Sequence, residues 1–205
     1  MNLLYVSHYK ESGSWGIASR QIMRALSKLD HSLFVAPIEN SNLEPELPED
    51  IKTIEKNSIP ENQSFDIVIQ YTLPSMFVKV GAFNIGITHT ETLGLNGSSW
   101  VENINNTLDE LWVFSSLEMY GLYESGVTVP IFVINYPPDL SYDKKDIVYN
   151  NPENNFRFYF IGEARDRKNL FAAILAYSRE FKKDENVEFI IKTNFLLIDD
   201  LNNFV

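Results

Sequence analysis

Short, nearly continuous apolar runs alternate with amphipathic segments along the first 137 residues of the chain. Such runs are typical of parallel strands that are buried on both faces, and their alternation with helices favours a doubly wound sheet. We therefore predict an α/β, Rossmann-like domain with a parallel sheet. The expected strands are Leu3–Ser7, Ser32–Ala36, Phe65–Tyr71, Phe83–Thr88, Glu110–Phe114 and Ile131–Asn135.

Three helices are expected between these strands, and the first spans about Gly16–Leu29. Its apolar positions fall on one face, as in an amphipathic surface helix. Those positions are Ala18, Ile22, Ala25, Leu26 and Leu29. The other two helices are expected at Ser98–Thr107 and Ser116–Glu124. Residues 38–63 are rich in Glu, Asn and Pro, which predicts an acidic loop with one short strand at Ile51–Ile54.

The pattern repeats after a polar, Pro-flanked stretch, residues 138–155, that has the composition of a linker. A strand-like run begins at Phe156, a basic loop and a helical run to Lys183 follow, and Val187–Lys192 predicts another strand. We therefore expect a complete domain over residues 1–137 and the first β-α-β portion of a second domain over 156–205. Because the sequence ends at Val205, we expect this second Rossmann-like domain to be incomplete.

Charge and composition narrow the classes of ligand. The formal net charge is −11, which argues against nucleic acid as a partner, because such binding needs clustered Lys and Arg. The absence of cysteine excludes disulfides and thiolate metal sites. We find neither a signal peptide nor an apolar run long enough for a transmembrane segment, so we expect a cytoplasmic protein.

Two loops could bind phosphate. The first follows the first strand and contains Gly13 and Gly16, where a ligand could approach the backbone closely; a tight turn packed with small residues is the alternative. The second contains Arg165, Arg167 and Lys168, whose side chains suit a diphosphate. Because Glu163 and Asp166 lie among these basic residues, a solvated loop of mixed charge is the alternative there.

A third candidate lies at the end of the fourth strand, in the segment Thr88–Thr92. Ligands of open α/β sheets gather at the carboxyl ends of strands, so His89 and Glu91 are well placed for catalysis. His89 could act as a hydrogen-bond partner or general base, with Glu91 orienting it or binding a hydroxyl. His8 also ends a strand and is a weaker candidate. No motif for a metal site or a nucleophilic serine is found.

Several segments form an ordered set along most of the chain. They are Leu3–Ser7 with its glycine loop, Gly86–Thr92, Trp100–Asn105, Leu108–Ser116, Gly121–Val127, Val129–Asp139 and Phe158–Tyr177. The set resembles the GT-B glycosyltransferases, in particular the family-4-like group (glycosyl transferases group 1). The resemblance implies two Rossmann-like domains, the first binding an acceptor and the second a nucleotide-sugar.

By this resemblance the chain would transfer a sugar from a nucleotide-sugar donor to an acceptor hydroxyl, with no cofactor and no essential metal. Gly16 would lie near the donor phosphates, His89 near the transferred sugar, and Lys168 on the diphosphate. The family often has Arg directly after the glycine of the second domain. Glu163 occupies that position here, so binding of the donor phosphates would shift to Arg165 or Arg167. The acceptor, whether a glycan, a lipid-linked sugar or a protein, stays open.

Two other classes stay open. A non-catalytic binding or assembly module that lost the donor half would expose apolar faces and pair with another chain or with itself. The E-x7-E element that holds the donor in the family does not follow Lys192, so we expect the chain alone to lack most of the polar contacts to a donor. A nucleotide-binding α/β protein unrelated to glycosyl transfer is the third possibility.

Overall fold

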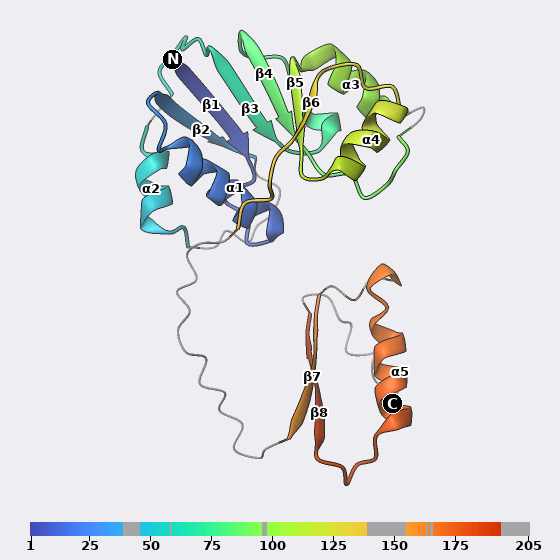
Figure 1. Ribbon diagram of the computed structural model, residues 1–205. Coiled ribbons are helices and arrows are strands. Elements are labelled where there is room, and N and C mark those ends of the chain that lie inside the picture. Colours follow the sequence, from blue (N-terminus) through green and yellow to red (C-terminus); the bar gives the residue numbers. More distant parts are fainter. Residues whose placement is uncertain are drawn as a thin grey trace. The chain divides into compact units, whose positions relative to one another are not determined.

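The computed structural model describes residues 1–38, 46–57, 59–95, 98–138, 155–162, 164 and 166–193 of the chain (Figure 1). The chain divides into two compact units, Met1–Asp143 and Lys144–Val205. Of the stretch expected to be a linker, residues 139–154 lie outside the described residues.

The described part of the first unit contains a six-stranded sheet in which every neighbouring pair is parallel. Its spatial order is β2-β1-β3-β4-β5-β6, so the chain reverses direction across the sheet between β1 and β3. The prediction of an α/β, Rossmann-like parallel sheet is confirmed. The strands are β1 Asn2–Ser7, β2 Ser32–Pro37, β3 Ile67–Tyr71, β4 Phe83–Ile87, β5 Glu110–Val113 and β6 Ile131–Val133.

Helices cover both faces of this sheet, and the alternation along β5 separates the two faces. Leu111 and Val113 belong to one apolar cluster, whereas Trp112 packs against the other. The helices α1 (Ser14–Leu26) and α2 (Glu49–Glu55) contribute to the cluster that Trp112 joins. The helices α3 (Ser99–Thr107) and α4 (Ser116–Glu124) contribute to the cluster of Leu111 and Val113. In Figure 1, α1 and α2 lie toward the β2 edge, and α3 and α4 toward the β6 edge.

Two expectations about local structure were wrong. The strand expected at Ile51–Ile54 is part of helix α2, because Ile51 and Ile54 are three residues apart and so pack against the first cluster from one helical face. The first helix ends at Leu26 rather than Leu29, and Ala25 and Leu29 are exposed.

Amide side chains support the irregular connection between β3 and β4, which contains only the short 3-10 helix η1 (Pro74–Met76). Gln70 bonds both the N–H and the carbonyl of Val78, and Asn84 accepts bonds from the N–H groups of Val80 and Gly81. From α3, Asn103 donates to the carbonyls of Pro74 and Phe77. These bonds satisfy backbone groups that a crossover helix would otherwise satisfy internally.

The second unit, over its described residues, is a parallel β-α-β arrangement of β7 (Phe156–Ile161), α5 (Leu170–Glu180) and β8 (Val187–Lys192). The short 3-10 helix η2 (Asp166–Lys168) precedes α5. Aromatic rings join the elements: the ring centroid of Tyr177 lies 6.0 Å from that of Phe158 and 5.3 Å from that of Phe189. Among all described residues, no helix is both long enough and apolar enough to cross a membrane.

The glycine loop after β1 folds back onto the first turn of α1. Arg20 donates from Nη1 to the backbone carbonyls of Tyr9 (2.7 Å) and Glu11 (2.8 Å). A Cβ added at Gly16 would overlap the Glu11 carbonyl, whereas a Cβ added at Gly13 would meet nothing within 4 Å. Gly16 therefore permits close packing of the protein's own loop, and Gly13 has an ordinary extended conformation with φ of −75°.

We predict that Gly16→Ala lowers the free energy of unfolding of the first unit by about 1–3 kcal/mol, because the loop must shift to admit the methyl group. The matched variant Gly13→Ser should change it by no more than about 0.5 kcal/mol, since serine is a good helix N-cap. Urea denaturation followed by tryptophan fluorescence measures both, and all three tryptophans lie in residues 1–143. Equal losses in the two variants would contradict this explanation of Gly16.

Candidate functional site

The carboxyl ends of the central strands bring several polar and aromatic side chains together. Tyr71 ends β3, His89 follows β4 by two residues, and Phe114 directly follows β5. The strand order reverses between β1 and β3, and ligands of open α/β sheets bind in the crevice at such a reversal. This edge of the sheet is therefore where the fold favours a ligand.

A cavity of about 750 Å³ lies at this edge, within the range of small-molecule sites. Its walls combine aromatic rings, hydroxyl groups and two carboxylates. They are formed by Ser14, Trp15, Leu73, His89, Thr90, Glu91, Thr92, Leu95, Ser98, Trp100, Glu118 and Tyr136. The structure thus brings His89 and Glu91, the two catalytic candidates from the sequence, into one cavity.

His89 is held by contacts at its two nitrogens and against its ring. Its Nε2 lies 2.7 Å from the hydroxyl oxygen of Tyr71, and its Nδ1 lies 3.8 Å from Oε1 of Glu118. The ring stacks on Phe114 with a centroid separation of 4.6 Å and meets Trp15 edge-on at 5.2 Å. Both ring nitrogens therefore face groups of the protein itself.

Burial lowers the pKa of His89 below its ordinary value, although the negative charges of Glu118 and Glu91 oppose that shift. The imidazole is accordingly neutral at pH 7. Burial also raises the pKa of Tyr71, so its phenol keeps its proton. The arrangement that uses both contacts has the phenol donating to Nε2 and the Nδ1–H directed toward the Glu118 carboxylate.

Glu118 fixes the geometry of this part of the cavity. One carboxylate oxygen accepts the backbone N–H of Thr90 (3.1 Å), and the other accepts the N–H of Phe114 (3.0 Å) and the hydroxyl of Ser115 (3.1 Å). The Ser115 hydroxyl in turn accepts the N–H of Glu118, which caps the start of α4. The ends of β4 and β5 are thereby tied to one side chain.

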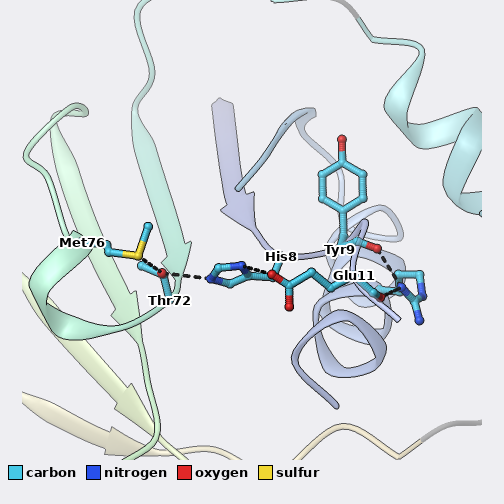
Figure 2. A network of polar contacts seen from close by, with 6 residues as sticks. His8, Tyr9, Glu11, Thr72 and Met76 are labelled. Carbon is cyan, nitrogen blue, oxygen red and sulfur yellow. Dashed lines mark hydrogen bonds and ion pairs between the residues drawn. The ribbon is translucent and has the colours of Figure 1, made fainter. Parts of the chain in front are cut away.

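A second histidine network lies at the ends of β1 and β3 (Figure 2). His8 places Nδ1 2.9 Å from a carboxylate oxygen of Glu11 and Nε2 3.1 Å from the hydroxyl of Thr72, which also lies 3.3 Å from the sulfur of Met76. Carboxylate, imidazole and hydroxyl stand in the order of a hydrolytic triad. Thr72 is only 1% exposed, however, so no substrate carbonyl reaches its hydroxyl, and we assign the network to holding β1 and β3 together.

The first phosphate candidate, the glycine loop, does not line this cavity. Gly13 and Gly16 lie at the start of α1 and are not among the lining residues, and the packing of Glu11 accounts for Gly16. In the second unit, Arg167 and Lys168 are exposed on η2. Arg165 and Glu163 lie outside the described residues.

Sequence reasoning missed most of the aromatic walls. Trp15 stacks on Tyr71 with a centroid separation of 4.8 Å, and Tyr136 lies 5.8 Å from the ring of His89. The rule that singled out His89, position at the end of a strand, would also have found Tyr71. The sequence offers no comparable signal for Tyr136, which reaches the site from beyond β6.

No protein-family model matches the sequence, and no curated protein matches it. The described residues contain no group of three or more His, Asp and Glu side chains that could hold a metal ion. The fold and the site together define the chain as an α/β protein with a Rossmann-like parallel sheet. A cavity lined by aromatic rings and carboxylates lies at the carboxyl ends of the strands.

We predict that His89 titrates below pH 6.5 and that Glu118→Gln lowers its pKa further, because a stabilising negative charge is lost. The folded pKa lies below the unfolded value, so the stability contributed by neutral His89 is complete above about pH 6.5. It is lost as the pH falls through the folded pKa. NMR titration of the imidazole carbon-bound protons measures the pKa.

Glu124→Gln is the control for this titration, because Glu124 is exposed on the same helix and is not a cause of the His89 shift. It should leave the pKa unchanged. A pKa of His89 at or above 6.5 in the unaltered protein would show that desolvation does not dominate.

Proposed function

We propose that this chain supplies the acceptor-binding side of a glycosyltransferase of the GT-B type, which transfers a sugar from a nucleotide-sugar to an acceptor hydroxyl. The observation that carries the proposal is the cavity at the strand-order reversal, where His89, Glu91 and aromatic rings face one space. Aromatic rings suit the apolar face of a sugar, and hydroxyl and carboxylate groups suit its hydroxyls.

The ordered resemblance along the sequence supports the same class. The segment Gly86–Thr92 of that resemblance forms the end of β4 and one wall of the cavity, and Leu108–Ser116 forms β5 with the start of α4. Ser14 and Thr90 add backbone and hydroxyl groups beside them. Trp100 and Tyr136, from two further segments of the resemblance, also line the cavity.

In the proposed reaction the acceptor oxygen forms a bond to the anomeric carbon, and the bond from that carbon to the nucleoside diphosphate breaks with the electron pair on the diphosphate. The hydroxyl proton needs an acceptor. Glu118 already accepts three hydrogen bonds, and both nitrogens of His89 face protein groups. We assign proton acceptance to the Glu91 carboxylate, which is exposed and lines the cavity, and positioning of the acceptor to His89.

One observation favours the second candidate, a non-catalytic binding module. His89 cannot accept a proton from a ligand without breaking its contact to Tyr71. A rigid, neutral imidazole stacked on Phe114 is well suited to recognition and poorly suited to base catalysis. In this alternative the same cavity binds a saccharide without transferring anything to it.

We expect saccharides at millimolar concentration to shift the indole N–H resonances of Trp15 and Trp100, which line the cavity, and not that of Trp112, which does not. Trp100→Ala should weaken binding about fivefold, for a loss of about 1 kcal/mol of contact. Leu117→Ala, an exposed residue of α4 outside the lining, is the control and should bind normally. If no saccharide shifts either resonance, the acceptor proposal fails.

The donor side is tested through Lys168. We expect saturation-transfer NMR to detect UDP-, GDP- or ADP-sugars and Lys168→Ala to weaken their binding at least about fivefold, through loss of a charge-assisted bond to phosphate. Lys183→Ala, exposed beyond α5, should leave the affinity unchanged. An unaltered affinity in Lys168→Ala removes the diphosphate role, and saccharide binding with no donor binding favours the module over the enzyme.

A further inference from the structure

The charged side chains in the described lining of the first unit's cavity are all of one sign. Glu91 and Glu118 are the two ionisable carboxylates of its described lining, and no Lys or Arg stands among those lining residues. Desolvation keeps His89 neutral, so it does not offset them. In a partly desolvated site such a field disfavours phosphate and favours positive charge.

The aromatic walls of the cavity also favour a positively charged ligand. Trp15, Trp100 and Tyr136 present aromatic rings to the cavity. The face of an indole or phenol ring attracts a cation through its quadrupole, and the attraction strengthens where water is excluded. Carboxylates next to aromatic faces are the pairing that recognises an ammonium group.

An unpartnered hydroxyl lies in the same wall. Ser98 is the N-cap of α3, a position where serine usually accepts a bond from a backbone N–H of the first turn. Its hydroxyl oxygen makes no such bond, is buried, and has no hydrogen-bond partner among the described residues. A buried polar group of this kind is stabilised when a ligand supplies the missing partner.

We propose that the acceptor bound in this cavity is a saccharide that carries a protonated amine, and that the cavity rejects phosphorylated and lipid-diphosphate-linked sugars. The ammonium group lies between Glu91 and the aromatic faces, and the sugar hydroxyls bond Ser98 and its neighbours. This inference rests on the proposed function for the saccharide part, and on the charge of the lining for the amine.

The test compares glucosamine, N-acetylglucosamine, glucose and glucose 6-phosphate as probes, with ethanolamine as an amine that is not a sugar. Binding is followed at pH 7 by the indole N–H shifts of Trp15 and Trp100, with Trp112 as the internal control. We expect glucosamine to bind at least about fivefold more tightly than glucose or N-acetylglucosamine, and glucose 6-phosphate more weakly than glucose. The preference should shrink in 0.5 M salt, because salt screens the attraction between charges. The screening length there is shorter than in dilute buffer by about threefold or more.

Glu91→Gln isolates the charge, because it keeps a hydrogen-bonding side chain of the same size. It should bring the affinity for glucosamine down to that for glucose, both measured in the same variant. Glu124→Gln, exposed on α4 and outside the lining, has the same change in net charge and should keep the preference. Unchanged urea denaturation of both variants would show that the loss of preference in Glu91→Gln does not come from unfolding.

The outcomes separate this inference from the function beneath it. Equal binding of glucosamine, N-acetylglucosamine and glucose overturns the amine inference and leaves the saccharide site standing. Tighter binding of glucose 6-phosphate than of glucose overturns it as well. Binding of ethanolamine with no binding of any sugar keeps the charge preference but removes the saccharide acceptor, and with it the proposed function.

Discussion

The carboxylate of Glu118 is the constraint on which the site depends. It joins the segment after β4, the end of β5 and the first turn of α4, through bonds from Thr90, Phe114 and Ser115. Hydrogen bonds to an ionised carboxylate are among the stronger ones in proteins. Because the same carboxylate also faces Nδ1 of His89, it orients the imidazole while it caps the helix.

This rigidity has a chemical consequence. Tyr71 occupies one nitrogen of His89 and is itself held by the stacked ring of Trp15. Moving His89 toward a ligand would therefore break a hydrogen bond and two ring contacts together. A histidine fixed in this way defines the shape and polarity of one wall of the cavity.

The sheet followed from local pattern, since buried parallel strands are continuous apolar runs and their order along the chain is visible in the sequence. Helix α2 did not, because so short a segment offers only two isoleucines, too few for periodicity to separate a helix from a strand. For the site, the position of His89 at the end of a strand was enough to identify it as a candidate. The bond from Thr90 to Glu118 joins residues 28 apart, and such pairings arise from packing that no local pattern encodes.

The two units carry opposite chemistry at their candidate sites. Carboxylates line the cavity of the first unit, whereas Arg167 and Lys168 lie exposed before α5 in the second. The carboxylates of the first unit disfavour a diphosphate and favour an amine. The basic residues of the second unit favour a diphosphate and disfavour an amine. The proposed division into an acceptor side in the first unit and a donor side in the second agrees with this difference in charge. A single bifunctional pocket in the first unit would need a cation that its described lining lacks.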